Sequence, residues 1–416
     1  MKTRLNAKNT IDAINTFAIP ALSYGYVVLD WSITELETID RETRKLLKKY
    51  HLLHENSDIT RLYLTRKLGG RGLTNVTDQY KNQVIQYSCY LRNTGDILLN
   101  LVSTWQTTRR AKSIHERANS YCDQLQLDVN EIATKTKEQR KNEIKTKRNT
   151  QKRNELKTKE MHGQYVKLLD EAHIDTIKST NWLRDSRLKR PTEAALCAIQ
   201  EQAITTKYIR KNVFKTTEDD ACRLCRTSKE TIHHIISGCP MLSATKYTER
   251  HDNVCKLIHM QLARKYELLD NNIEEKWFKY DPEPLLEDEN TKILWNFPIQ
   301  TDHLVRHNKP DLLVIEKKKR KAFIIDIAVP NDNNIMKKRR EKMLNYETLS
   351  FEIKQLWNLE TVSIVPIVVG ATGIVHNKFE ELIKEKLDIN PNTKEIQKIA
   401  ILGTVYITRY FLQHDI

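Results

Sequence analysis

The sequence predicts a multidomain protein of the α plus α/β class, in which a long helical region precedes an α/β domain with a mixed sheet. Two observations predict this order. Apolar residues recur at helical spacing through most of the first half of the chain, whereas from about residue 292 they gather in short β-rich runs between helices. A cluster of Cys and His residues separates the two patterns and marks a third element.

The charge composition indicates which class of partner the protein binds. The chain has 416 residues, with 69 Lys and Arg against 54 Asp and Glu, and a formal net charge of +15. This excess favours a polyanionic partner, nucleic acid first and an anionic membrane surface second. No apolar run reaches the ~18 residues that a membrane-spanning helix needs. Residues 1–6 lack the apolar stretch of a secretory signal, so we expect a soluble protein.

Helical signals dominate the first hundred residues. An apolar stripe predicts a helix over residues 6–26 with a kink at Pro20, and Ser32-Ile-Thr-Glu35 is a capping box that opens the next helix. Residues 69–72, Gly-Gly-Arg-Gly, predict a turn, and helical patterning resumes over residues 76–102. The apolar stripe of the second helix is expected to contain Leu36, Ile39, Leu46 and Leu47.

Residues 131–160 have a different character, with eleven Lys and Arg against five Asp and Glu and almost no large apolar side chains. This pattern is typical of a solvated charged helix or a partly disordered linker. It also fits a basic surface that binds phosphates without sequence preference, and the two interpretations are compatible. Helical patterning returns over residues 161–215.

The Cys/His cluster has the spacing of a zinc site. Cys222, Cys225, His234 and Cys239 follow the pattern C-x2-C-x8-H-x4-C, which allows two thiolates to bind one ion and a His and a Cys to complete a tetrahedron. The adjacent His233 gives a poorer spacing to Cys239. A closed site of this kind is structural, because no coordination position stays open for water. The alternative is a pair of buried cysteines beside surface histidines.

The other four cysteines stand alone in the sequence, which does not suggest a disulfide framework. We expect them to be buried small hydrophobic residues. They are Cys89, Cys122, Cys197 and Cys255.

Residues 292–416 alternate between strand and helix patterns, as expected of a mixed sheet with flanking helices. Strands are predicted at residues 293–295, 311–315, 322–329 and 362–369, and helices at residues 334–358, 375–387 and 393–412.

The second and third of these strands form a predicted hairpin with two carboxylates. A symmetric turn centred between Lys318 and Lys319 would place Asp311 opposite Asp326, with Cβ atoms about 5 Å apart, where like charges destabilise the pair. A divalent metal with oxygen ligands would compensate both charges. Metal and paired carboxylates suit phosphodiester hydrolysis. The alternative is an edge hairpin with Asp311 exposed after Pro310.

A basic helix follows the hairpin. Lys342 and Tyr346 are four residues apart and share one face of it, which makes both candidate catalytic side chains. A lysine near the metal would stabilise the charged transition state. Alternatively, Lys342 is one more solvated lysine in a basic run. The candidate contacts to the nucleic-acid backbone are Lys309, Lys337, Lys338, Arg339 and Arg340.

Taken together, these segments resemble the C-terminal half of a non-LTR retrotransposon polyprotein of the restriction-like-endonuclease class. The zinc motif resembles the CCHC element of that family, and Lys309-Pro-Asp311 with Asp326-Ile-Ala-Val-Pro330 resembles its endonuclease core. The other resembling stretches are residues 13–20, 62–64 and 69–73, similar to the family's thumb, residues 162–165 and 182–184, similar to its linker helices, and Gly370-Ala-Thr-Gly373.

The resemblance implies a domain order and a fold. It implies a nuclease of the PD-(D/E)xK superfamily, although the residue two after Asp326 is Ala328 rather than lysine, which makes Lys342 the candidate for that role. The implied segments are a thumb-like helical region (1–105), a basic helical linker (106–215), the CCHC zinc element (216–245), connecting helices (246–291) and the restriction-like endonuclease domain (292–416).

The resemblance also implies cofactors, partners and a function. Asp311 and Asp326 would bind catalytic Mg²⁺ or Mn²⁺, and the four Cys/His ligands structural Zn²⁺. The protein would act in the nucleus, after synthesis in the cytoplasm, nicking target DNA to prime reverse transcription of the element RNA. The Asp219-Asp220 pair lies beside the zinc motif, without the strand context of a polymerase palm. We therefore expect no polymerase activity, and a polyprotein whose palm and N-terminal DNA-binding region lie outside this sequence.

Two other interpretations remain. The chain is alternatively a nucleic-acid-binding remnant of such an element, with an inactive nuclease. A free-standing resolvase or repair nuclease of the same superfamily is the second alternative, and the thumb-like first hundred residues disfavour it.

Overall fold

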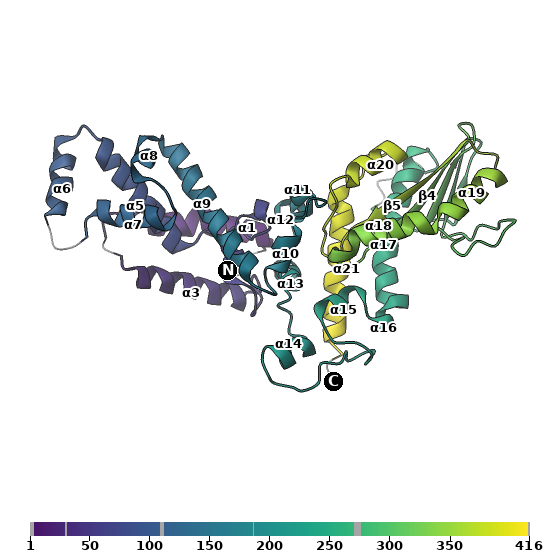
Figure 1. The fold of residues 1–416 in the computed structure, drawn as a ribbon, viewed down its shortest axis with the longest axis horizontal. Coiled ribbons are helices and arrows are strands. Elements are labelled where there is room, and N and C mark those ends of the chain that lie inside the picture. The colour runs from purple at the N-terminus through teal and green to yellow at the C-terminus, as the bar shows by residue number, and fades with distance from the viewer. Residues whose placement is uncertain (1–3, 30, 109–111, 186, 270–275, 415–416) are drawn as a thin grey trace. The chain divides into compact units, whose positions relative to one another are not determined.

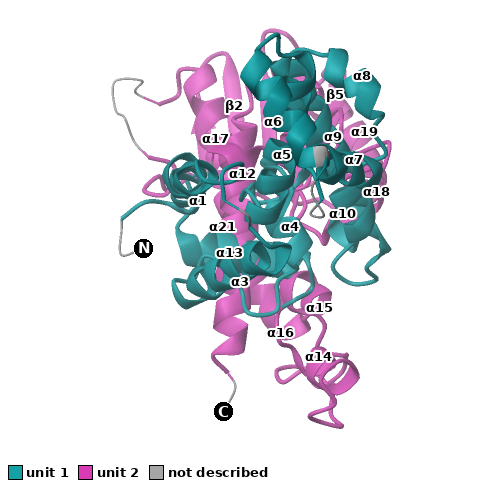
Figure 2. Ribbon diagram, turned by 90° about the vertical axis from the view of Figure 1, so that its left-hand side faces the viewer, with its two compact units in different colours: residues 1–167, 187–203 teal, residues 168–186, 204–416 magenta. Residues whose placement is uncertain are grey.

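The computed structural model describes residues 4–29, 31–108, 112–185, 187–269 and 276–414. The chain forms two compact units, which Figure 2 colours separately. Unit 1 comprises residues 1–167 and 187–203, and unit 2 comprises residues 168–186 and 204–416. The stretch 106–215, expected to be one linker, therefore contributes to both units. Among the residues described, no helix has both the length and the apolar character required to cross a bilayer.

The regular elements in the described part of unit 1 are all helices, as the sequence predicts. Its helices are α1 (Ala7–Ala13), a π-helical turn (Ile14–Ala18), α2 (Ile19–Ser23), α3 (Ile33–Lys49), α4 (Ile59–Tyr63), a 3₁₀ turn (Arg66–Leu68), α5 (Val76–Asn93), α6 (Ile97–Thr107), α7 (Ile114–Gln124), α8 (Val129–Thr134), α9 (Lys137–Thr158), α10 (Gln164–Leu168) and α13 (Arg190–Gln200).

The start of α3 matches its sequence signals, but the predicted stripe does not match completely. Ser32 and Glu35 form the expected capping box, in which the Glu35 amide donates to Ser32 Oγ at 3.2 Å and Glu35 Oε2 accepts from the Ser32 amide at 2.9 Å. Leu36 and Leu47 are fully buried. The prediction was wrong at Leu46, which is 46% exposed, because adjacent residues point about 100° apart around a helix and Leu47 takes the buried position.

Two predicted helices are interrupted. The helix over residues 6–26 is divided by a π-helical turn directly before Pro20, which lies in the first turn of α2, where a missing N–H costs little. The helix over residues 76–102 is divided after α5. Asp96 caps the start of α6 by accepting a hydrogen bond from the Leu99 amide at 3.0 Å.

The charged stretch 131–160 is mainly one helix, α9, which opens with a capping box of Thr136 and Gln139. It carries few buried residues, so polar contacts must hold it in unit 1. Arg148 supplies one of them, pairing with Asp78 of α5 at 2.7 Å. The solvated-helix interpretation is thus confirmed for residues 137–158.

The glycine-rich turn at residues 69–72 positions a buried arginine. Gly69 and Gly72 have positive φ angles of 84° and 78°. A Cβ on Gly70 would lie 2.1 Å from the Leu64 carbonyl oxygen, so this position excludes every larger residue. The turn directs Arg71 into unit 1, where its guanidinium lies 2.9 Å from Glu193 Oε1.

Arg71 belongs to a buried ionic network. Glu193, on α13, also pairs with Arg66 at 3.0 Å, and Glu201 pairs with Arg61 at 3.2 Å. Burial alone would raise the pKa of Glu193, but Arg71 and Arg66 outweigh burial and lower it. The network joins α13 to the turn that residues 61–72 form.

Unit 2 contains the sheet. Its helices are α11 (Thr176–Ser179), α12 (Asn181–Asp185), α14 (Lys207–Asn212), α15 (Ile232–Ser237), α16 (Pro240–Leu242), a π-helical turn (Ser243–Tyr247), α17 (Thr248–Lys265), a 3₁₀ turn (Asp332–Asn334), α18 (Ile335–Asn345), α19 (Glu347–Leu356), α20 (Phe379–Leu387) and α21 (Thr393–Leu412). Its strands are β1 (Leu285–Glu287), β2 (Thr291–Trp295), β3 (Leu312–Glu316), β4 (Lys321–Ala328) and β5 (Thr361–Val368).

Within the described residues, the strands form one mixed five-stranded sheet in the order β1-β2-β3-β4-β5 (Figure 1). The first four strands pair antiparallel in sequence, and β5 pairs parallel to β4 after the crossover through α18 and α19. One sheet face packs against α17, α20 and α21 through residues such as Ile325 and Ile327. The other face packs against α19 through Ile324, Leu349 and Ile353.

Most predicted elements of this sheet domain are present. Strand β1 is an addition, because the sequence predicted helices over residues 246–291, and its three residues carry too short a pattern to recognise. The helix predicted over residues 334–358 is two helices that meet at Tyr346. The next helix begins at Phe379 rather than at residue 375, because residues 370–378 form a loop.

We predict that Glu193→Ala destabilises unit 1 by about 3–5 kcal/mol, because it leaves Arg66 and Arg71 buried without a carboxylate. The measurement is the free energy of unfolding from chemical denaturation of the full chain. The matched control is Glu42→Ala, since Glu42 pairs with Lys45 on an exposed helix face and should contribute little. Similar effects of the two changes would contradict a structural role for the network.

Candidate functional site

The four predicted zinc ligands lie together in unit 2. The ligand atoms of Cys222, Cys225, His234 and Cys239 all lie within 4.8 Å of one another. The Sγ atoms of Cys222 and Cys239 are 3.9 Å apart, and Cys225 Sγ is 3.4 Å from His234 Nε2. These distances match the edges of a zinc tetrahedron, roughly 3.8 Å between two sulfurs and 3.6 Å between sulfur and nitrogen. The cluster can therefore hold a structural zinc ion.

The local backbone explains how this short segment presents four ligands. Ala221 and Lys229 form an isolated antiparallel bridge, and the turn between them passes through Arg226 at a positive φ of 57°. The turn brings Cys222 and Cys225 to one side. His234 lies on α15 and Cys239 directly precedes α16, so a helix and a turn supply the other two ligands.

Neighbouring polar groups support the ligands. Tyr247 Oη accepts a hydrogen bond from the Cys239 amide at 3.0 Å and donates to the Ile235 carbonyl at 2.7 Å. Arg223 and Glu230 form a buried pair at 2.6 Å within the loop. His233 does not join the cluster, as the spacing predicts. Its Nδ1 instead accepts a hydrogen bond from Asn331 Nδ2 at 2.6 Å, which joins the zinc element to the segment after β4.

The carboxylate pair lies at one end of the β3–β4 hairpin. Leu312 pairs with Ile325 and Glu316 with Lys321, so the register is that of a turn centred between Lys318 and Lys319, as predicted. Continuing this register by one pair places Asp311 opposite Asp326. Asp326 is 2% exposed, whereas Asp311, which precedes β3, is half-buried.

Asp326 is held by the two side chains predicted on one helix face. Lys342 Nζ lies 2.6 Å from Asp326 Oδ2, and Tyr346 Oη donates to Asp326 Oδ1 at 2.7 Å. Burial and the charge of Asp311 raise the pKa of Asp326, although Lys342 and Tyr346 act in the opposite direction. Burial and the adjacent carboxylate also raise the pKa of Tyr346. The phenol thus remains a hydrogen-bond donor at neutral pH.

Asp311 has a different set of partners. Its Oδ2 accepts a hydrogen bond from the Ile327 amide at 2.6 Å and lies 3.0 Å from His251 Nε2. His251 lies in the second turn of α17, and its Nδ1 is 3.0 Å from Asp252 Oδ1. Burial lowers the pKa of His251, but Cys255, Asp252 and Asp311 outweigh burial and raise it.

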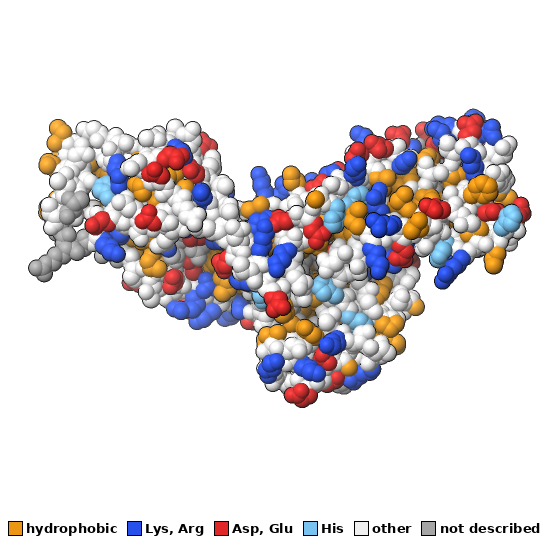
Figure 3. Space-filling model, in the orientation of Figure 1, with side chains coloured by type: hydrophobic (Ala, Val, Ile, Leu, Met, Phe, Trp, Pro, Cys, Tyr) orange, Lys and Arg blue, Asp and Glu red, His pale blue; other side chains and the backbone are white. Residues whose placement is uncertain are grey.

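Four of the five predicted backbone-binding residues lie on α18, the helix that carries Lys342, and the fifth, Lys309, lies two residues before Asp311. Lys309, Lys337 and Arg340 are exposed, whereas Lys338 pairs with Glu341 at 2.8 Å and Arg339 is half-buried. Figure 3 shows Lys and Arg side chains on the face of unit 2 that carries α18. The site thus combines two carboxylates and a lysine with an electropositive surround, which suits a phosphate ester.

The Gly370-Ala-Thr-Gly373 motif forms a cradle for another carboxylate. Thr372 donates its amide and its hydroxyl to Asp332, at 3.1 and 2.5 Å. A Cβ on Gly370 would lie 2.1 Å from Asp332 Oδ1, so a larger residue there would displace the carboxylate from this position. Burial raises the pKa of Asp332 to about 6. The motif therefore fixes the loop that leads from β4 into α18.

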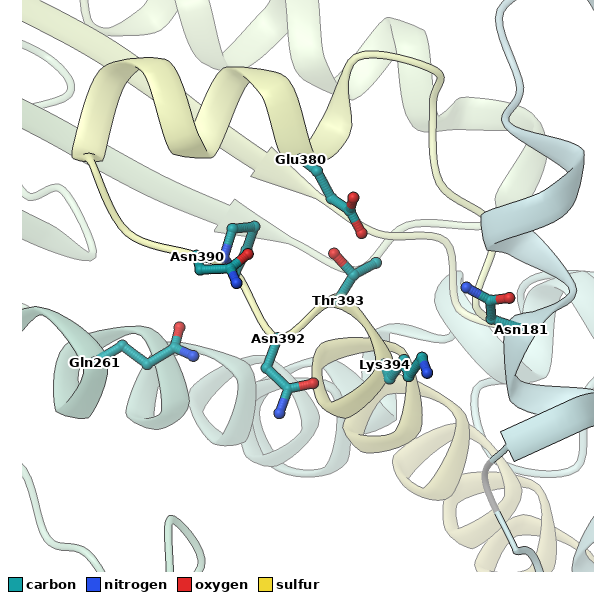
Figure 4. A pocket seen from close by; sticks show the side chains of 8 residues that line it. Asn181, Gln261, Glu380, Asn390, Asn392, Thr393 and Lys394 are labelled. Atoms are coloured by element: carbon teal, nitrogen blue, oxygen red, sulfur yellow. The ribbon is translucent and has the colours of Figure 1, made fainter.

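A separate pocket of about 440 Å³ lies beside the start of α21 (Figure 4). Its charged side chains are already paired, Glu380 with Lys178 at 2.9 Å and Lys394 with Asp185 at 2.8 Å. The rest of its lining is largely carboxamide. It contains neither a metal-ligand cluster nor paired carboxylates, so the hairpin site remains the candidate centre.

Sequence reasoning missed His251. Its ring, Asp311 and Cys255 form a second group of potential ligand atoms within 4.8 Å of one another. The i,i+4 spacing of His251 and Cys255 on one helix face was the available signal. The four isolated cysteines are all buried, as expected, but Cys255 borders the site.

No protein-family model matches the sequence, and no curated protein matches it at a significant level.

We predict about one zinc ion per chain, and the free energy of binding at such a site is on the order of 10 kcal/mol. Cys225→Ser should lose the zinc, because a hydroxyl is a poor replacement for a thiolate ligand. Elemental analysis of protein purified without chelator measures the content. Cys122→Ser, a buried cysteine of unit 1, is the matched control and should retain zinc. Wild-type protein without zinc would exclude the site.

Proposed function

We propose that unit 2 is a metal-dependent endonuclease that nicks one strand of duplex DNA. The observation that carries the proposal is the environment of Asp326. A buried carboxylate lies opposite a second one on a paired strand and contacts a lysine and a tyrosine from the following helix. Two carboxylates and one lysine are the groups that phosphodiester hydrolysis needs.

The residues present fit a divalent cation. Asp326 and Asp311 bring two negative charges to one end of the hairpin, and Lys342 supplies one compensating charge near them. Like charges this close need further compensation, which hard cations provide to carboxylate oxygens. When bound, Mg²⁺ or Mn²⁺ would polarise the phosphate and lower the pKa of a water nucleophile.

The protein side chains would orient the two carboxylates and stabilise negative charge on the phosphate. Tyr346 fixes Asp326 through its hydroxyl, and the Ile327 amide fixes Asp311, so both carboxylates are held before substrate binds. Lys342 would stabilise negative charge that develops on the phosphate. The exposed Lys309, Lys337 and Arg340 would bind backbone phosphates on either side.

We further propose that the chain derives from a non-LTR retrotransposon and that its nick primes reverse transcription of the element RNA. Nucleic-acid binding would extend to unit 1. On α9, Lys137, Lys141 and Lys145 are exposed at intervals of about one helical turn and form a basic stripe. In this proposal the zinc element is structural, target DNA and element RNA are the partners, and the protein acts in the nucleus.

The second candidate is an inactive nucleic-acid-binding remnant. The contact between Lys342 and Asp326 favours it, since a closed ion pair neutralises the carboxylate without any metal. The two candidates make opposite predictions about metal-dependent cleavage.

We predict that Asp311→Asn and Asp326→Asn each abolish nicking of supercoiled DNA in Mg²⁺ or Mn²⁺, because each removes a charged ligand while keeping its shape. DNA affinity should remain or increase, since each change deletes a charge that repels phosphate. Agarose-gel nicking assays and fluorescence anisotropy at fixed salt give the two measurements. Full activity of the Asp326 variant would reject the nuclease, and wild-type binding without cleavage would support the remnant.

We predict that Lys342→Ala lowers the nicking rate about 10²-fold or more, the cost of one preorganised transition-state donor. Lys338→Ala is the matched control, because Lys338 lies one turn earlier on the same helix and pairs with Glu341. Single-turnover rates on one supercoiled substrate compare the two variants. Equal losses would reduce Lys342 to a contact with the DNA backbone.

A further inference from the structure

His251 approaches the carboxylate site from the helix that packs against one face of the sheet. Its Nε2 atom lies 3.0 Å from Asp311 Oδ2 and 3.0 Å from the Ile327 carbonyl oxygen. One ring nitrogen therefore faces two oxygen atoms, on the two strands that carry the carboxylates. This nitrogen carries at most one proton, so it can donate a full hydrogen bond to only one of the two oxygens.

The spacing of these three atoms is that of ligands around one cation. Octahedral sites with bonds of about 2.1 Å have neighbouring ligand atoms roughly 3.0 Å apart. Both distances from Nε2, 3.0 Å, equal this value. The potential ligand atoms of His251, Cys255 and Asp311 also lie within 4.8 Å of one another, in a group that does not include Asp326.

A contact at the other ring nitrogen, Nδ1, fixes the orientation of the His251 ring. His251 Nδ1 lies 3.0 Å from Asp252 Oδ1, which holds the Nδ1 proton and leaves Nε2 as the ligating atom. Cys255, one turn further along α17, is 1% exposed and packs against the ring, with Sγ 3.8 Å from Nε2. A histidine oriented by a carboxylate in this way is a common feature of metal sites.

We propose that His251 is a ligand of the catalytic cation, so that the site has mixed nitrogen and oxygen coordination and selects Mn²⁺ over Mg²⁺. This inference rests on the proposed nuclease function, which by itself leaves the choice between the two ions open. Imidazole favours later first-row cations, whereas Mg²⁺ prefers oxygen ligands alone. Cation binding replaces the Nε2 proton, which leaves to solvent.

The test uses the full chain with its zinc site loaded, and Mn²⁺ as the probe. Titration of Mn²⁺, followed by the electron paramagnetic resonance of the free ion, gives its affinity, and competition with Mg²⁺ gives the preference. Wild-type protein should bind Mn²⁺ more tightly than Mg²⁺. His251→Gln keeps a donor for Asp311 but should lower Mn²⁺ affinity about 10-fold or more, with a smaller loss for Mg²⁺.

A second variant and a control separate a ligand from a structural role. His251→Asp replaces nitrogen by oxygen, so it should retain cation binding and shift the preference towards Mg²⁺. His303→Ala is the control histidine of the same unit, since His303 is exposed and pairs with Glu352. It should leave both affinities unchanged. Thermal melting verifies that each variant is folded.

Pulsed resonance of bound Mn²⁺ in protein labelled with ¹⁵N-histidine gives the direct readout. Nitrogen coupling that His251→Gln removes would establish the ligand. Unchanged Mn²⁺ affinity in that variant, or bound Mn²⁺ without nitrogen coupling, would overturn the inference. Bound Mn²⁺ with nitrogen coupling but no nicking would reject the proposed function and leave the ligand assignment intact. Nicking by protein whose bound Mn²⁺ shows no nitrogen coupling would reject the ligand assignment and leave the proposed function intact.

Discussion

The burial of one carboxylate governs the arrangement of the sheet domain. Asp326 lies on β4, an interior strand, where an uncompensated charge would be strongly destabilising. The crossover from β4 to β5 must therefore return a cation to the strand. Helix α18 does so with Lys342, although Ile335 is its one buried residue among those described. The helix then breaks at Tyr346, which lets α19 bury Leu349 and Ile353 against the same sheet face. The ion pair between Lys342 and Asp326 therefore anchors α18 to the sheet, whereas apolar contacts anchor α19.

The zinc element is a second segment that has little apolar surface of its own and depends on polar contacts. Its four candidate ligands lie together, and Cys222 and Cys239 pack with Ile407 and Phe411 of α21. The hydrogen bond from Asn331 to His233 then joins it to the segment that leaves β4. Asn331 is five positions after Asp326 in the sequence, so one hydrogen bond and a short length of backbone join the candidate zinc site to the candidate catalytic carboxylate.

Local signals predicted most of this fold, and tertiary signals explain what they missed. Apolar periodicity and a symmetric turn were enough to predict the β3–β4 register, and the spacing of the motif was enough to predict the zinc ligands. Both predictions depend on residues that lie near one another in the sequence. The break at Tyr346 was not predicted, since helical spacing continues through it, and the contact of Tyr346 with Asp326 joins residues twenty positions apart in the sequence. His251 was missed for the same reason. Its relation to Asp311 spans sixty residues and exists only once α17 packs against the sheet.

The division of the chain affects its biosynthesis. Unit 1 is completed by residues 187–203, after the chain has contributed residues 168–186 to unit 2. Arg71 leaves the ribosome 122 residues before Glu193, the carboxylate that neutralises it. At about 5–20 residues per second, the nascent chain spends roughly 6–25 seconds with this arginine unpaired. During that interval unit 1 cannot yet form the Arg71–Glu193 contact, so its closure depends on residues synthesised after the first segment of unit 2.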